Sequence, residues 1–119
     1  MAATTGLLLS PTASADELCG FTLTAPEVAH MAYGVDLVTA TLTPGKCPGK
    51  TAVNSVTVCV AAAGQPGRCK SEPGNNVAKI FLEHTARGAV YTATGKGCSR
   101  YGDPIQSTCV TYGPAQATL

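Results

Sequence analysis

The chain has 119 residues, of which six are cysteine, 5% are aromatic and 13% are charged, with a formal net charge of +1. A chain of this length suffices for one small core and no second domain. It lacks the dense Lys and Arg and the aromatic platforms of a nucleic-acid-binding surface, and no apolar run reaches the roughly 18 residues of a membrane-spanning helix. An even number of cysteines in so short a chain is typical of a secreted domain held together by disulfides.

The first 15 residues have features of an export signal. Leu7-Leu8-Leu9 is apolar, and Ala13-Ser14-Ala15 places small residues where a signal peptidase cleaves, before Asp16. No Lys or Arg precedes residue 46, so the usual positive start is missing, and a pro-segment or an Ala/Thr-rich tail is an alternative. We expect a signal-peptide-like segment over residues 1–15 and a single secreted, extracellular domain over residues 16–119.

Residues 24–34 carry the first local structural signal. Thr24-x-x-Glu27 is a capping-box pattern and Gly34 is a possible stop, so a short helical turn near residues 25–33 is one possibility and a non-helical link is the other. Farther along, apolar residues recur at every second position over 38–42, 56–60 and 78–82, which is typical of strands. Segments rich in Pro and Gly separate these stretches and predict turns.

Residues 77–84 could also form a helix capped by Asn76, but the segment after them favours a strand. Gly88-Ala89-Val90-Tyr91-Thr92-Ala93, following a strand and a short polar link, resembles the E–F corner of immunoglobulin-like sandwiches, where a Tyr hydroxyl binds backbone. There is no Trp, and no cysteine lies in the expected strands B (35–43) and E. The resemblance is therefore to the broad immunoglobulin-like or fibronectin-like architecture, and it implies an all-β, antiparallel sandwich without implying a function.

Six cysteines allow fifteen pairings. In the sandwich that the resemblance implies, consecutive cysteines lie on neighbouring antiparallel strands, close enough to bond. The predicted disulfides are Cys19–Cys47, Cys59–Cys69 and Cys98–Cys109. Each is expected to contribute about 2–4 kcal/mol, which offsets the scarcity of large core residues.

The sequence offers little for catalysis. His30 and His84 are the only histidines, and neither a Gly-x-Ser-x-Gly elbow nor a Cys-x-x-Cys motif occurs. We expect a monomer that is not an enzyme, with no cofactor, no metal and no nucleic-acid partner.

The expected B–C loop (44–52) and F–G loop (97–110) lie at the same end of such a sandwich, and rigid loops on a β-scaffold are common binding sites. This end would bind a polar or anionic ligand, or a protein partner, unless its bases are ordinary solvated charges. The candidate ligand-binding residues are Lys46, Lys50, Lys96, Arg100 and Tyr101.

Two other functions remain open. The loop closed by Cys98–Cys109 contains Arg100-Tyr101, and Arg68 precedes Cys69, so the protein could be a secreted protease inhibitor that presents a covalently closed, pre-ordered loop. It could also be a structural domain of the cell envelope or extracellular matrix, for which the sequence offers no test.

Overall fold

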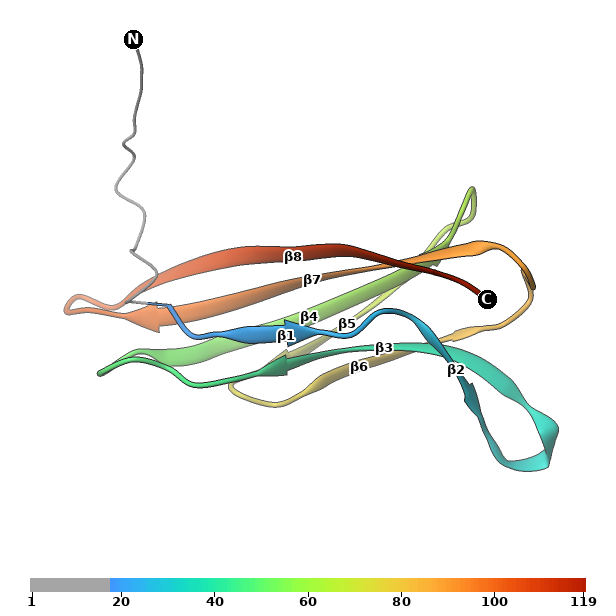
Figure 1. The fold of residues 1–119 in the computed structure, drawn as a ribbon. Helices are drawn as coiled ribbons and strands as arrows, with labels where there is room; N and C mark the ends of the chain where they lie inside the picture. The colour runs from blue at the N-terminus through green and yellow to red at the C-terminus, as the bar shows by residue number, and fades with distance from the viewer. Residues whose placement is uncertain (1–17) are drawn as a thin grey trace, which may run out of the picture.

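The computed structural model describes residues 18–119, so the signal-peptide prediction for residues 1–15 lies outside the described part. Two antiparallel sheets face each other (Figure 1). The first sheet contains β1 (Phe21–Leu23), β2 (Glu27–His30), β3 (Asp36–Pro44) and β6 (Ala78–Glu83). The second contains β4 (Ala52–Ala62), β5 (Arg68–Pro73), β7 (Val90–Tyr101) and β8 (Gln106–Thr118). The all-β, immunoglobulin-like sandwich expected from the sequence is confirmed.

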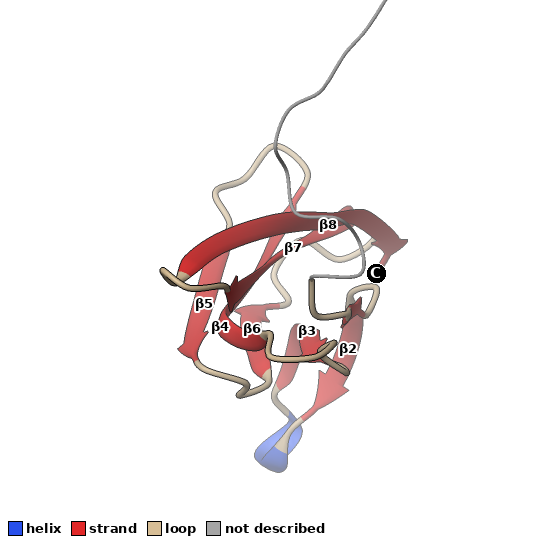
Figure 2. Cartoon of the chain, turned by 90° about the vertical axis from the view of Figure 1, so that its left-hand side faces the viewer, coloured by secondary structure: helices blue, strands red, loops and turns tan. Residues whose placement is uncertain are grey.

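The order of the strands sets the positions of the loops. In the first sheet β3 is central, with β6 along one side and β1 and β2 sharing the other. The second sheet runs β5-β4-β7-β8, so β5 and β8 are its edges (Figure 2). The sheets face each other without closing into a barrel. Among residues 18–119 there is no helix of the length and apolarity needed to cross a bilayer.

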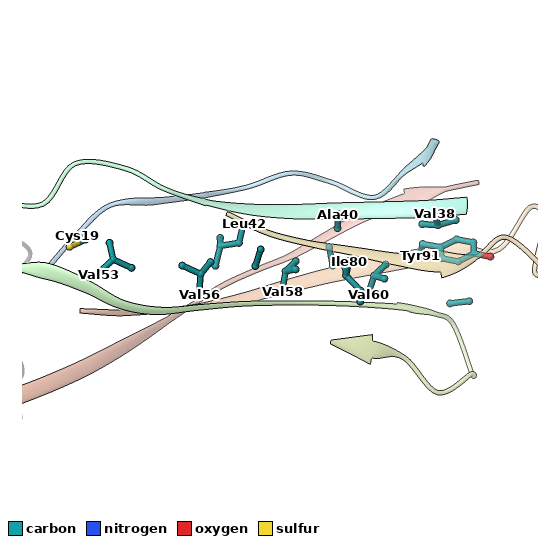
Figure 3. Packing of buried hydrophobic residues seen from close by; sticks show 13 residues of the cluster. Cys19, Val38, Ala40, Leu42, Val53, Val56, Val58, Val60, Ile80 and Tyr91 are labelled. Atoms are coloured by element: carbon teal, nitrogen blue, oxygen red, sulfur yellow. The ribbon is translucent and has the colours of Figure 1, made fainter. Parts of the chain in front are cut away.

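The core is made mostly of small aliphatic side chains between the sheets (Figure 3). Val38, Ala40 and Leu42 of β3 are fully buried, as are alternate valines of β4, because every second residue of a strand points to the same side. Close packing also depends on Gly97 of β7, where a Cβ would lie 2.5 Å from the Phe21 ring. Small residues thus compensate for the lack of aromatic bulk by letting the layers approach closely.

The segment before β3 is mostly extended. Only a short 3₁₀ turn, Ala32–Gly34, forms at the end of the range where a helical turn was considered. Thr24 does not cap a helix, because its hydroxyl oxygen accepts a 3.0 Å hydrogen bond from the Thr41 N–H. Glu27 lies opposite Thr39 in the β2–β3 ladder. Pairing with β3 therefore overrides the local capping signal.

The corner between β6 and β7 has the contact that the resemblance implied. Tyr91 is fully buried, and its hydroxyl oxygen accepts a 3.3 Å hydrogen bond from the Ala86 N–H. His84 packs edge-on against the Tyr91 ring, with centroids 5.8 Å apart, and its Nε2 lies 2.9 Å from the Leu119 carbonyl oxygen. These contacts fix the link between the two sheets at this end.

The three disulfides are the pairs that the topology predicts: Cys19–Cys47, Cys59–Cys69 and Cys98–Cys109. The first ties the start of the described chain to the connection between β3 and β4. The other two each join residues that lie directly opposite in neighbouring strands of the second sheet. Three such bonds suit an oxidising environment.

Candidate functional site

Two connections lie at one end of the sandwich, on the left of Figure 1. Residues 45–51 join β3 to β4, close to the predicted 44–52, and residues 102–105 join β7 to β8. The second connection is much shorter than the predicted 97–110. The paired cysteines 98 and 109 lie directly opposite each other, and the β7–β8 ladder continues past them to the Tyr101–Gln106 pair. We call this region, residues 45–51 with 100–105, the loop end.

Lys96 does not belong to the loop end. It lies within β7, between Thr57 of β4 and Thr111 of β8, with its side chain exposed on the sheet. It lies five positions before Tyr101, or roughly 17 Å away along an extended strand. The sequence places it with the other bases only if the F–G loop begins near residue 97, whereas β7 continues to Tyr101.

The other strand-borne candidates do lie together. Arg100 and Tyr101 end β7, and with Lys50 they line a hollow of about 380 Å³ that also includes Asp103 and Ile105. The Tyr101 hydroxyl is 3.0 Å from Thr108 Oγ1, which holds the ring against the β7–β8 hairpin. The hollow therefore lies where the end of β7 meets the β3–β4 connection and the β7–β8 turn.

A second hollow, of about 430 Å³, lies on the other side of Arg100. Thr51 and Val53 line it from the β3–β4 side, and Gly74 and Asn75 line it from the β5–β6 turn. Sequence reasoning missed these turn residues. The Pro73-Gly74-Asn75-Asn76 motif predicts a turn but not the end of the sandwich at which that turn lies.

The arrangement makes Arg100 the shared wall of both hollows. Among residues 18–119, no carboxylate lies within 4.0 Å of the charged nitrogens of Lys46, Lys50 or Arg100, since the ion pairs there involve other residues. Arg100 is exposed, and a guanidinium has five N–H donors in a planar fork that suits carboxylate and phosphate oxygens. The loop end thus offers positive charge that no ion pair within residues 18–119 neutralises.

Hydrogen bonds and a disulfide hold the backbone that carries Lys46 and Arg100. Lys46 is exposed, but its carbonyl oxygen accepts a 3.0 Å hydrogen bond from the Gly20 N–H, beside the Cys19–Cys47 bond. The Cys19 N–H donates a buried 3.0 Å hydrogen bond to Ser99 Oγ of β7. Both the connection bearing Lys46 and the strand bearing Arg100 are thereby joined to the same N-terminal segment.

The protease-inhibitor alternative gains no support from this geometry. The backbone of Arg100 lies between two paired strands of the second sheet, opposite Ala52 of β4 on one side and Ser107 of β8 on the other. A substrate-like loop needs free backbone on both sides of its basic residue so that a protease can pair with it. Arg68, the other basic residue considered, pairs with Val60 at the start of β5.

The two histidines have structural contacts. His30 Nδ1 lies 2.8 Å from Asp36 Oδ1, and His84 contacts the Leu119 carbonyl oxygen as described above. Within the described part of the chain, His, Cys, Asp and Glu side chains form no group of three that could hold a metal ion.

Comparison of the chain with protein-family models, curated proteins and solved structures gives no match. The chemistry of the loop end is therefore the basis for any functional proposal.

Proposed function

We propose that this protein is a secreted, non-enzymatic binding module whose loop end takes up a carboxylate- or phosphate-bearing ligand. The observation that supports this proposal is the position of Arg100, exposed, without an ion-pair partner among the described residues, and lining hollows on both sides. Hydrogen bonds from a guanidinium to an anion are short, charge-assisted and often bidentate. An anion at Arg100 would satisfy donors that the described part of the chain leaves to water.

The neighbouring residues suit the rest of such a ligand. Lys50 adds a second positive charge to the hollow, and Lys46 lies on the same connection between β3 and β4. The Tyr101 ring and Ile105 provide apolar surface, while Asp103 is the single acid in the β7–β8 turn. The ligand class is therefore an anionic compound with an apolar part, or an acidic segment of a protein partner.

The test is an NMR titration of the full chain with citrate and with pyrophosphate. We expect amide shifts concentrated at residues 45–51 and 100–105, and about tenfold weaker binding in Arg100→Gln, because a hydrogen bond to a charged group contributes about 1.5–3 kcal/mol. Lys96→Gln and Arg68→Gln are matched controls that each remove one exposed base away from the loop end. Equal weakening in all three variants, or shifts scattered over the surface, would show that only net charge attracts these anions and would defeat the proposal.

A further inference from the structure

The outer side of β8 is an open sheet edge. β8 pairs with β7 on one side, and no strand among residues 18–119 pairs with the other (Figure 2). At 13 residues, β8 is the longest strand in the part of the chain that the structure describes. An edge of this length presents a row of backbone donors and acceptors to solvent.

The register shows which backbone groups point outward. Cys98 and Cys109 lie directly opposite each other with Cα atoms 4.0 Å apart, the close spacing typical of a pair that is not hydrogen-bonded across the ladder. The backbone N–H and C=O groups of Cys109, and of Ser107 and Thr111 two positions away, therefore point away from β7. No backbone hydrogen bond from another described segment reaches these three residues.

The two edges of this sheet differ in how they are protected. β5, the opposite edge, carries Arg68, Lys70 and Glu72 and ends at Pro73. Lys70 and Glu72 lie opposite the buried residues Val58 and Val56, so charges occupy the inward-facing positions of that edge. Charge and proline are the usual means of blocking edge-to-edge pairing.

β8 lacks most of this protection. It has no charged residue from Gln106 to Thr118, and its one proline, Pro114, lies in the irregularity of the register opposite Ala93–Gly95, after the segment Gln106–Tyr112. The segment Gln106–Tyr112 is therefore extended, uncharged, free of proline and unpaired on one side. This is the property of an edge that accepts another strand.

We propose that Gln106–Tyr112 pairs antiparallel with the same segment of a second copy of this chain, across a two-fold axis at Cys109. Ser107 then lies opposite Thr111 of the second copy, twice by symmetry, which is a favourable hydroxyl pair. Thr108 lies opposite Val110 in the same register. The second sheets of the two copies become one continuous sheet of eight strands.

A second copy can pair with this edge because a two-fold axis brings the same segment of both copies together. The segment carries no charge, so it does not repel its symmetry-related copy. The Cys109 side chain, at the axis, is bonded to Cys98 of the same copy and so does not block the approach of the second copy. Ile105, directly before the segment, is 76% exposed, and Thr111 and Tyr112 at its other end line a hollow of about 420 Å³. This inference differs from the monomer expected from the sequence, because sheet edges become visible only in the strand order.

The test is sedimentation of the full chain from micromolar to about 1 mM, since an interface of a single strand pair is at the weak end of protein–protein contacts. We expect a concentration-dependent dimer. The double variant Ser107→Glu/Thr111→Glu should raise the dimer dissociation constant at least about tenfold, because like charges then face each other twice across the axis. Within one copy the new carboxylates lie opposite Arg100 and Lys96, so folding is expected to be retained.

Two controls make the result specific. Ser71→Glu/Asn75→Glu adds the same charge near the other edge and should leave the dissociation constant unchanged. Ser107→Glu/Thr111→Lys should restore dimerisation, since the introduced glutamate of one copy meets the introduced lysine of the other. A chain that is monomeric at every concentration would overturn the inference. A dimer whose dissociation constant is unchanged by the β8 substitutions would also overturn it. Binding of a foreign extended peptide at β8 without self-association would assign the edge to another partner and would also overturn it.

Discussion

The loop end and the opposite end of the sandwich, where β2 turns into β3 and β6 passes to β7, are held in different ways. At the loop end the Cys19–Cys47 bond and two backbone hydrogen bonds between Gly20 and the connection at Gly45-Lys46 fix the link between β3 and β4. The connection itself is largely exposed and carries charge. A covalent bond there provides order that burial cannot supply.

The opposite end, which we call the corner end, has the Cys59–Cys69 disulfide close to it, but that bond joins β4 to β5 beside their hairpin and does not reach the β2–β3 turn or the β6–β7 link. The corner end depends on the buried Tyr91 ring and hydroxyl, and on Asp36, which contacts His30 and Arg87. Its hairpin tip exposes Tyr33 completely, in a left-handed conformation at φ 62°, which is uncommon for a residue with a side chain. The comparison indicates that the β3–β4 connection under the basic surface is anchored covalently, while the β2–β3 turn and the β6–β7 link are held by packing, hydrogen bonds and ion pairs.

The largest expected effect is at the loop end. Cys19→Ala/Cys47→Ala should lower the free energy of unfolding by about 3 kcal/mol, because the bond closes a loop of 28 residues. It should also speed hydrogen exchange in residues 45–51. Denaturant unfolding and exchange mass spectrometry measure both. The control is Cys59→Ala/Cys69→Ala, which opens a loop of only 10 residues and should leave exchange at 45–51 unchanged. Equal exchange there in both variants would contradict the anchoring role.

The sequence predicts strands where a local pattern of apolar residues fixes them, but not the length of a loop that depends on strand register. The alternation over residues 38–42, 56–60 and 78–82 predicts β3, β4 and β6, because each faces the core on one side. The extent of the F–G loop was not predictable, since cysteines 11 residues apart suit either a wide loop or a long hairpin, and only the register decides. The placement of Lys96 was wrong for that reason.

The candidate site was predictable only where local signals fix position. Arg100, Tyr101 and Lys50 come together because the loops flanking them are set by the sandwich topology. Asn75 reaches the same end through the course of β5, which no local pattern reveals. The open edge at β8 also depends on sheet order, since an uncharged strand becomes an edge only when no neighbour covers it.

A smaller effect is expected at the corner end. Tyr91→Phe keeps the buried ring but removes the acceptor of the Ala86 N–H, and it should lower the free energy of unfolding by about 1 kcal/mol. Tyr101→Phe is the matched change at the loop end, where the hydroxyl contacts Thr108 in a half-exposed position. We expect a smaller loss there, because water can replace a surface partner. Chemical denaturation of both variants measures the difference, and a larger loss in Tyr101→Phe would reverse the proposed division between the two ends.

The smallest effect concerns acid, and Asp36 is the group involved. The 2.8 Å hydrogen bond from His30 Nδ1–H to Asp36 Oδ1 lowers the pKa of the Asp36 carboxyl below its ordinary value. Partial burial opposes this shift, and the charges of Arg87 and His84 add to it. A carboxyl whose pKa is lower in the folded state stabilises the fold above its unfolded pKa, near 4, and this contribution is lost as the pH falls through the folded pKa.

Asp36→Asn should therefore be less stable than the unsubstituted protein at pH 5, and the difference should shrink as the pH falls towards about 2. Thermal melts across this range measure it. Asp103→Asn is the matched control, because Asp103 lies in the turn at the loop end and forms no ion pair with another described residue. Its effect on stability should be smaller and should vary less with pH. A difference for Asp36→Asn that stays constant from pH 5 to pH 2 would mean that the side chain acts through its shape or neutral hydrogen bonds. The corner end would then depend on Tyr91 and its neighbours without the charged contact that we assign to Asp36.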